Sequence, residues 1–517
     1  MLKFLIALLI LTSSAQAHAE KILFIPHDDR PVSFRQPAEV VSMLGYEIIS
    51  PNPELLTEPD LLWAWLNDNA ASADAAVLST DALLYGGLIP SRSHQIDADI
   101  LNARVQNFKA LRDNNPKLQI YAFGSLMRTP QFGTPGDREE PDYYGEHGVN
   151  IFQLTALLDK QETDTLKPWE KLQLESLQNM IPDEILDDYF ARRLKNLSAT
   201  VNLLDFAADG TIDYFIIGRD DNSELSQTHR ENRQLLAYME YIPKTKAQSL
   251  AGIDEYAMLL LTRAVNDLRG ESPGVNVQFN RGRGKRTVPA YSDEQIGNSI
   301  LDEILIAGAK FTDKPDRADF ILMVNTDPKG NTYHFHNAFP PQGLTESQQK
   351  YFARNAEDFT AQIEDALNKN LPVGVADIVV ANGSDNFLMA QLRDKNLLFK
   401  LQSYAGWNTA TNSTGFALGA GILAKKMSRS AKNRLLATRY LDDWGFQANV
   451  RSQIAEELSR RPDGLQIYLD FGEYEAAVVE RENQLMHAFA DENLPLWKDF
   501  TVSNPWRRMF ECDVNFE

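Results

Sequence analysis

The sequence predicts an α/β protein: a β/α-barrel-like parallel sheet with a helical insertion and a helical C-terminal region. Short β-branched runs alternate with longer amphipathic segments along most of the chain, a pattern typical of parallel strands covered by helices. Two stretches break this alternation, and polar residues follow most of the predicted strands. The expected boundaries are 20–423 for the α/β domain, about 129–210 for the insertion within it, and 424–517 for the C-terminal region.

Nine segments have the composition of buried strands. They are Ile22–Pro26, Glu47–Ser50, Ala75–Ser79, Gln119–Phe123, Tyr214–Gly218, Val275–Phe279, Phe320–Asn325, Val373–Ala381 and Leu401–Tyr404. Helical periodicity separates most of them, as in Asp99–Asn114, Asp254–Leu268, Asp293–Ala307 and Thr345–Asn368. Nine strands are close to the eight of a β/α barrel, so we expect a barrel-like sheet.

The two exceptions to the alternation are read as additions to the sheet. The segment from residue 129 to 210 opens with the Pro/Gly-rich loop Thr129–Gly148 and continues as charged helical sequence. It is therefore predicted to be an insertion after the fourth strand. Beyond residue 424 the pattern is helical, and Gln466–Phe471 is the one strand signal there.

The first 19 residues have the pattern of a cleavable export signal. Lys3 precedes the apolar run Phe4–Leu11, and small residues follow at Ala15, Ala17 and Ala19 with the spacing of a signal peptidase site. An apolar run of about eight residues is too short to span a bilayer. The mature protein is therefore expected to be periplasmic or secreted, without membrane insertion.

Composition limits the possible ligands. The chain has 51 Lys and Arg against 72 Asp and Glu, a net charge of -21, and one cysteine. Such a charge disfavours nucleic acids and anionic membranes, and one cysteine excludes an intrachain disulfide or a four-cysteine zinc site. No GxGxxG or P-loop pattern occurs, so no nucleotide cofactor is expected. The expected partner is a small-molecule or oligosaccharide substrate, and no cofactor is expected. The sequence leaves the oligomeric state open.

Polar residues follow seven of the predicted strands. Turns and helix caps favour such residues, but the carboxyl ends of parallel strands also carry the active sites of α/β proteins. We therefore expect one polar pocket there. The candidates are Asp28, Asp29, Arg30, Asp81, Tyr85, Arg128, Asp220, Asp221, Asn222, Asn382, Asp385, Trp407 and Asn408.

Five segments, in one order, resemble a bacterial family of unknown function, number 4127. They are IPHDDRPVS, STDALLYGGLIPSR, GRDDNSELSQTHRE, GIDEYAMLLLTRA and SYAGWNTATNSTG. The resemblance covers nearly the whole mature chain. It implies no activity, so the chemistry has to be argued from the residues.

The pair Asp220 and Asp221, after the apolar run YFIIG, is similar to the aspartate pair of N-acetylhexosaminidases that use substrate-assisted catalysis. In that chemistry the substrate acetamide is the nucleophile, the first aspartate orients it and the second is the general acid. Trp407 and Asn408 suit a sugar, because an aromatic ring stacks on its apolar face and amides bind its hydroxyls. The favoured function is an exported glycoside hydrolase acting on small neutral or N-acetylated sugars.

Two other functions stay open. His27-Asp28-Asp29 is similar to the strand end of zinc-dependent deacetylases of N-acetylsugars, and His334 and His336 would share one face of a strand. A metal-dependent deacetylase or amidohydrolase is therefore one alternative, although no HExxH motif occurs. A non-catalytic periplasmic sugar-binding protein is the other.

Overall fold

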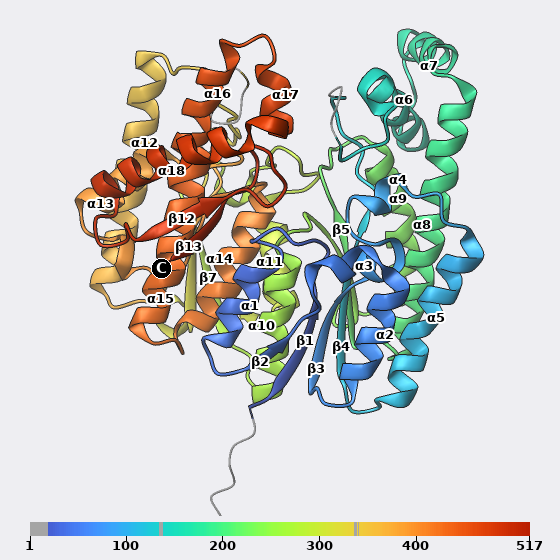
Figure 1. Cartoon of the computed structure of the whole chain (residues 1–517), viewed down its shortest axis with the longest axis horizontal. Coiled ribbons are helices and arrows are strands. Elements are labelled where there is room, and N and C mark those ends of the chain that lie inside the picture. Colours follow the sequence, from blue (N-terminus) through green and yellow to red (C-terminus); the bar gives the residue numbers. More distant parts are fainter. Residues whose placement is uncertain (1–18, 134–137, 336–338, 340, 517) are drawn as a thin grey trace, which may run out of the picture.

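The computed structural model describes residues 19–133, 138–335, 339 and 341–516. It has the predicted α/β class, with two parallel sheets of six and five strands (Figure 1). Residues 1–18 of the predicted export signal lie outside the described residues. Within them, no helix combines the length and apolar character needed to cross a membrane.

The first sheet has the strand order β2-β1-β3-β4-β5-β6. Its strands are β1 (Lys21–Ile25), β2 (Glu47–Ile49), β3 (Ala75–Ser79), β4 (Gln119–Leu126), β5 (Tyr214–Arg219) and β6 (Ala247–Ala251). Both faces are buried: Ile22 and Phe24 of β1 face one apolar core, and Leu23 and Ile25 face another. Burial on both faces explains why these strands are continuous apolar runs.

The second sheet has the order β11-β10-β9-β7-β8. Its strands are β7 (Gly274–Phe279), β8 (Lys310–Phe311), β9 (Phe320–Asn325), β10 (Val373–Asp377) and β11 (Tyr404–Ala405). In β9, Phe320 and Leu322 share a core with the first sheet, whereas Ile321 and Met323 face the opposite side. The two sheets are therefore stacked around one central apolar layer.

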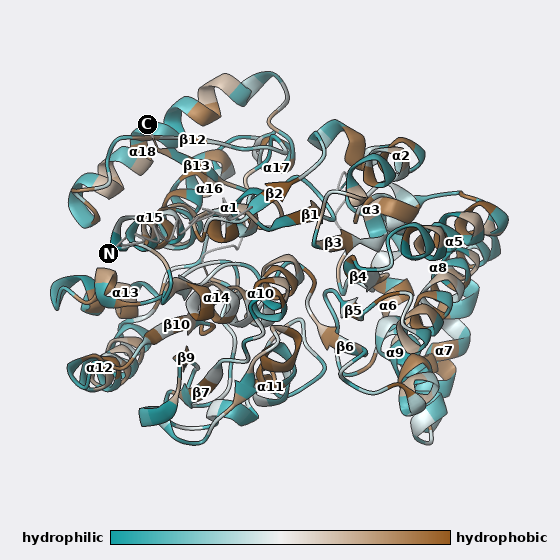
Figure 2. Cartoon of the chain, turned by 90° about the horizontal axis from the view of Figure 1, so that it is seen from below, coloured by the Kyte–Doolittle hydropathy of each residue, from teal (hydrophilic) through white to brown (hydrophobic). Residues whose placement is uncertain are grey.

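Helices fill that central layer. They are α1 (Arg35–Ser42), α10 (Tyr256–Arg269), α11 (Ile296–Ile306) and α14 (Ala410–Ala424). Every residue of α14 is buried, and Figure 2 shows α10 and α14 side by side in the interior of the molecule. Close packing requires small residues: a Cβ on Gly421 would lie 2.2 Å from the Phe320 ring.

The outer layers cover the remaining sheet faces. On the first sheet lie α2 (Pro59–Ala70), α3 (Thr80–Tyr85), α4 (Pro90–Ser93), α5 (Ala98–Asn114), α8 (Asp183–Asp209) and α9 (Gln227–Tyr238), and α6 (Tyr144–Thr163) and α7 (Pro168–Met180) pack nearby. On the second lie α12 (Glu346–Asn368), α13 (Asn386–Asp394), α15 (Arg429–Arg439), α16 (Arg451–Ser459), α17 (Gly464–Leu469), α18 (Glu475–Asn493) and the hairpin β12 (Phe500–Ser503) and β13 (Asp513–Phe516). A π-helix (Tyr440–Val450) joins α15 to α16.

The division of the sheet and several strands differ from the sequence prediction, in which β6, β8, β12 and β13 are absent. The strands divide into two sheets because α10, which follows β6, packs between them; alternation along the chain does not say which strands pair. Strand β6 was missed because its sequence, AQSLA, has little β-branched character. The predicted strand Gln466–Phe471 was wrong: Gly464–Leu469 is helix α17, and a short apolar run does not distinguish the two.

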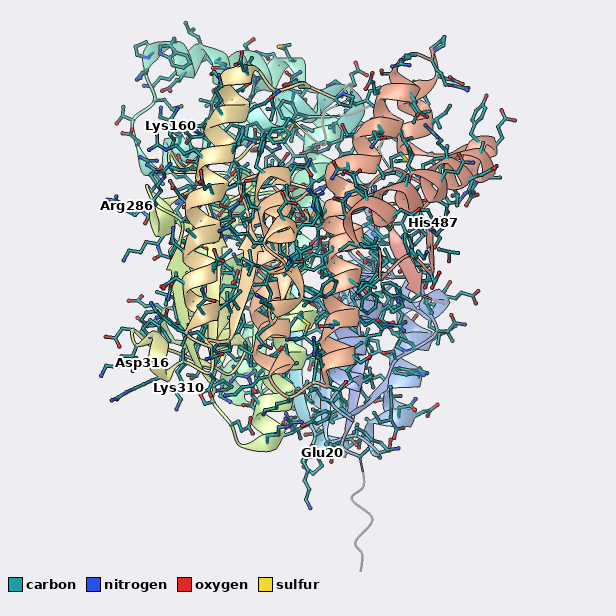
Figure 3. The ribbon with its side chains drawn as sticks, turned by 90° about the vertical axis from the view of Figure 1, so that its left-hand side faces the viewer. Glu20, Lys160, Arg286, Lys310, Asp316 and His487 are labelled. Carbon is teal, nitrogen blue, oxygen red and sulfur yellow. The ribbon has the colours of Figure 1, made fainter. Side chains whose placement is uncertain are left out.

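The carboxyl ends of both sheets face the same end of the molecule. Helices α6 and α7 from one side and α16 and α17 from the other rise beyond these strand ends (Figure 1). Figure 3 shows the opposite end, where Glu20 and Lys310 lie at strand starts, far from Lys160 in α6. Loops from both sheets therefore meet at one edge.

Candidate functional site

A cavity of about 370 Å³ lies at this edge, between the two sheets. Its charged and amide lining comprises Arg30, Arg92, Arg128, Gln131, Glu139, Asp220, Asp221, Asp254, Asn382, Asn408, Arg451 and Arg508, and its aromatic lining comprises Phe132, Tyr291, Tyr468, Trp506 and Phe510. A larger hollow, of about 1160 Å³, shares Pro130 and Phe132 with it but is lined mainly by the inserted segment. The smaller cavity is the candidate site because charged groups from both sheets converge on it.

Six of the sequence candidates line this cavity: Arg30, Arg128, Asp220, Asp221, Asn382 and Asn408. Asp28, Asp29, Asp81, Tyr85, Asn222, Asp385 and Trp407 are not among the lining residues. Strand-end position therefore brings together residues that follow five strands, but it does not decide which of their side chains face the cavity.

Three of the excluded candidates are core residues. Trp407 is 4 % exposed and packs on Phe510, so its ring has no free face for a sugar. Tyr85 stacks on His94 with ring centroids 4.9 Å apart. Asp81 is buried and accepts hydrogen bonds from the backbone N–H of Ser125. These three side chains are held in the core and do not line the cavity.

Of the other four, Asp28, Asp29 and Asn222 contact lining residues, whereas Asp385 caps a helix. Asp28 pairs with Arg30, and Asp29 accepts a hydrogen bond from Nε1 of Trp506 at 2.7 Å. The backbone N–H of Asn222 donates to the carbonyl of Tyr291. Asp385 caps α13 by accepting from the N–H of Phe387.

Asp220 and Asp221 follow β5 and belong to a crowded acidic cluster. Arg92 pairs with Asp220 at 2.6 Å, and Arg128 pairs with Asp221 at 2.7 Å. The same two arginines also pair with Glu139 and Glu140, and Arg508 pairs with Glu139. In this Asp220–Asp221 cluster, four carboxyl groups thus face three guanidinium groups.

The charge imbalance favours a retained proton. Removal from water, followed by repulsion from Asp220, raises the pKa of Asp221 to about 7, against the opposing effect of Arg128. Burial would raise the pKa of Glu139, but Arg128, Arg508 and Arg92 outweigh it and lower the pKa well below its usual range. Burial also raises the pKa of Glu140, against Arg128 and Arg92. Asp221, with a pKa raised to about 7, is the cavity-lining carboxyl group best placed to carry a proton near neutral pH.

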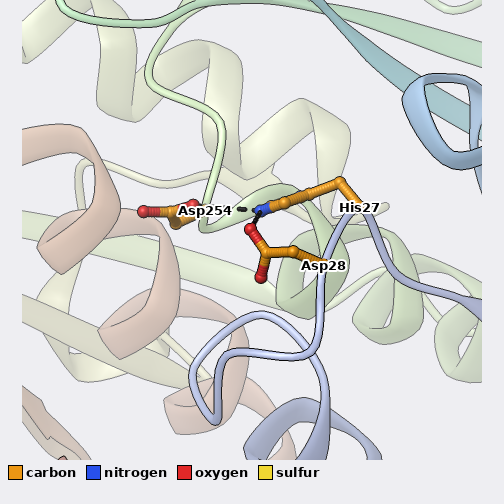
Figure 4. A group of neighbouring side chains, drawn as sticks. All are labelled: His27, Asp28 and Asp254. Atoms are coloured by element: carbon orange, nitrogen blue, oxygen red, sulfur yellow. Dashed lines mark hydrogen bonds and ion pairs between the residues drawn. The ribbon is translucent and has the colours of Figure 1, made fainter. Parts of the chain in front are cut away.

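The second polar cluster, here called the His27 cluster, is formed by His27, Asp28 and Arg30 after β1 and by Asp254 after β6. Figure 4 shows His27, Asp28 and Asp254. His27 Nε2 lies 3.2 Å from Asp28 Oδ2 and 3.1 Å from Asp254 Oδ1. Nη2 of Arg30 lies 2.7 Å and 2.6 Å from the same two oxygens. Asn408 and Asn412 donate to the other oxygen of Asp254.

Here the charges balance. Burial would lower the pKa of His27, but Asp28 and Asp254 outweigh it and raise the pKa to about 9. Burial would raise the pKa of Asp254, but Arg30 and His27 outweigh it and lower that pKa. Two ionised carboxylates therefore face two cations.

His27, Asp28 and Asp254 also form a possible metal-ligand set. One ligand atom from each of His27, Asp28 and Asp254 lies within 4.8 Å of the others. Nη2 of Arg30 is 3.2 Å from His27 Nε2 and pairs with both carboxylates, so a guanidinium nitrogen occupies the point where the three atoms converge. Of the two histidines in the metal hypothesis, His334 packs edge-on to Tyr291 and His336 lies outside the described residues.

Strained backbone gathers around the cavity. Seven described non-glycine residues have a positive φ, and four of them line it: Asp221 (φ 40°), Tyr291 (φ 64°), Asn382 (φ 53°) and Asn408 (φ 66°). Such conformations cost about 1–3 kcal/mol each and cluster at functional sites. The buried Oδ1 of Asn382 has no partner among the described residues, so this amide is available to a ligand.

The wall opposite the strand ends was not predicted. It consists of Arg451, Tyr468, Trp506, Arg508 and Phe510, here called the arginine–aromatic wall. Arg30 and Arg508 lie over the Trp506 ring at 5.1 and 4.8 Å, and Arg451 lies over Phe510 at 4.8 Å. The spacing of Arg and aromatic residues in PWRRMF was the available signal for part of this wall.

The sequence profile of a protein family of unknown function, DUF4127, matches residues 22–515. The chain belongs to this family. A comparison with curated proteins finds no match. The family assignment agrees with the resemblance seen in the five sequence segments and leaves the activity to the site.

Proposed function

We propose that this protein is an exported glycoside hydrolase in which Asp221 is the general acid and Asp220 is its partner. The observation that carries the proposal is the carboxyl pair Asp220 and Asp221, which follows β5 and lines the cavity. Removal from water, followed by repulsion from Asp220, raises the pKa of Asp221 to about 7. A carboxyl group that keeps a proton near neutral pH beside a second carboxyl group is typical of a general acid.

Each residue has a role that its contacts support. Asp221 would donate its proton to the glycosidic oxygen as the bond to the leaving group breaks. Asp220, fixed by Arg92 at 2.6 Å, would orient the substrate group that attacks the anomeric carbon. The amides of Asn382 and Asn408 line the cavity and suit sugar hydroxyls.

The test compares two substrate types. After a screen of aryl glycosides has found one that is turned over, wild type and Asp221→Asn are compared on it and on a substrate with a poor leaving group. We expect a loss of roughly a hundredfold or more on the poor leaving group and a much smaller loss on the activated aryl glycoside. Equal activity of both proteins on the poor leaving group would refute the role of Asp221.

The metal-dependent deacetylase is a second candidate because His27, Asp28 and Asp254 converge. Elemental analysis decides it: stoichiometric zinc, lost together with activity on chelation, would favour this function over hydrolysis of a glycosidic bond. Tight sugar binding with no product after hours would instead favour a binding protein.

A further inference from the structure

Five arginines line the cavity, and four of them are neutralised by carboxylates. Arg30 pairs with Asp28 and Asp254. Arg92 pairs with Asp220, Arg128 with Asp221, and Arg508 with Glu511. Arg451 differs from these four, since within the described part of the chain no carboxylate pairs with it.

The contacts of Arg451 leave one edge of its guanidinium group uncommitted. Nε donates to the hydroxyl of Tyr468 at 2.7 Å, and Nη1 donates to Oε1 of Gln447 at 2.9 Å. Nη2 has no hydrogen-bond partner among the described residues, although the side chain is 3 % exposed. A buried cation without a counter-charge is costly, so this position favours an anion.

Tyr468 supplies a second donor beside it. Its hydroxyl accepts from Nε of Arg451, and its own proton goes to no other described residue. Nη2 and the N–H of Nε share the edge of the guanidinium group that faces away from Cδ, so Nη2 points to the same side as the hydrogen bond from Nε to this hydroxyl. Two adjacent donors, one of them charged, match the two oxygens of a carboxylate.

We infer that Arg451 and Tyr468 form a subsite for a carboxylate group of the substrate, so that the cavity selects sugar acids over neutral sugars. This inference rests on the proposed function, because only that function identifies the ligand as a sugar. The subsite also reverses the expectation from net charge: the chain is acidic overall, at -21, but the cavity offers an unpaired cation. Local charge, and not the total, decides which ligand binds in an enclosed site.

The test is a binding measurement that needs no turnover. Titration calorimetry compares glucuronate with glucose, and N-acetylmuramate with N-acetylglucosamine, since the members of each pair differ by a carboxylate. We expect wild type to bind the acid of at least one pair tenfold or more tightly than its neutral partner. Arg451→Met should lose this preference and keep neutral-sugar binding within about twofold, and Arg451→Lys should retain part of it.

Three controls make the outcome decisive. Arg460→Met removes one charge from the exposed end of the same helical segment and should leave the preference unchanged. Tyr468→Phe keeps the ring and should lower the preference less than Arg451→Met does. Three outcomes would overturn the inference. Folded wild type could bind acid and neutral sugars equally, or the preference for the acid could survive in Arg451→Met. Sulfate could also compete as strongly as the sugar acid does. Acid-selective binding without hydrolysis of any glycoside would instead count against the proposed function and leave the subsite in place.

Discussion

The two acidic clusters at the candidate site contain the same residue types but differ in their charge balance. In the His27 cluster, Asp28 and Asp254 share Arg30 and face the imidazole of His27. In the Asp220–Asp221 cluster, Arg92 and Arg128 are shared with Glu139 and Glu140. The first cluster lowers the pKa of its Asp254, whereas the second raises the pKa of its Asp221.

The comparison shows that the number of carboxyl groups per cation, and not burial alone, decides where a proton stays. Burial opposes ionisation of Asp254 as well as Asp221. The cations outweigh burial at Asp254 but not at Asp221, so the His27 cluster suits a structural or electrostatic role and Asp221 suits proton transfer.

The largest expected effect is on stability, from removing Arg30. Arg30→Met leaves the buried carboxylates of Asp28 and Asp254 with His27 as their remaining cation. Breaking a buried ion pair by removing one partner costs about 3–5 kcal/mol. Urea unfolding should show a fall of this size in the free energy of unfolding. The control, Arg460→Met, removes an exposed pair with Glu456 and should cost at most about 1 kcal/mol. A loss of similar size in both variants would contradict the special role of the His27 cluster.

The next effect is a pH dependence of stability caused by His27. Its pKa in the folded protein is about 9, above the ordinary value near 6.5. A raised pKa stabilises the fold fully below the unfolded value, and the stabilisation is lost as the pH rises through the folded value. Wild type should therefore lose stability between about pH 6.5 and 9, with a slope of up to about 1.4 kcal/mol per pH unit.

His27→Gln should remove this part of the slope. His487, which packs on Phe500 outside the cavity, offers the control variant His487→Gln. Urea unfolding curves at half-unit pH steps measure both. The same slope in wild type and His27→Gln would show that His27 is not a buried cation.

Strand-end reasoning found the Asp220–Asp221 pair because a parallel sheet fixes where its carboxyl ends point. It also found Arg30, Arg128, Asn382 and Asn408. It could not exclude Trp407, since the sequence does not reveal that Phe510, about a hundred residues later, packs on this ring. Sequence alternation gave the α/β class but not the division into two sheets, which depends on α10 and α14 packing between them.

The arginine–aromatic wall could not be predicted by the same reasoning. Its residues come from the C-terminal region, where no parallel strand ends. Asp254 was missed for a related reason: it follows β6, whose polar sequence gave no strand signal. Local sequence patterns locate residues relative to their own element, whereas these groups reach the cavity through long-range packing.

A smaller effect, on rate, separates the two contributions to the pKa of Asp221. Asp220→Asn removes a repulsion and should lower this pKa, whereas Arg128→Gln removes an attraction and should raise it. The general acid must be protonated, so the rate falls as the pH rises through its pKa. The alkaline limb of kcat/KM should therefore move to lower pH in Asp220→Asn and to higher pH in Arg128→Gln. A shift of one pH unit changes the rate about tenfold at a fixed pH on that limb. Limbs that move in the same direction would contradict the charge-balance argument.

The smallest expected effect is that of metal on wild type. Nη2 of Arg30 already pairs with both carboxylates near His27 Nε2, and a divalent ion there would have to displace a buried guanidinium group. Chelation or added zinc should therefore leave the unfolding midpoint of wild type unchanged.

Arg30→Met frees one imidazole and two carboxylate ligands, a set that zinc accepts. In that variant zinc should restore part of the lost stability, by about 2.7 kcal/mol when its concentration is a hundred times Kd. If chelation lowered the stability of wild type, the ligand set would bind a metal and Arg30 would have to move aside. The metal-dependent deacetylase would then be the better-supported function.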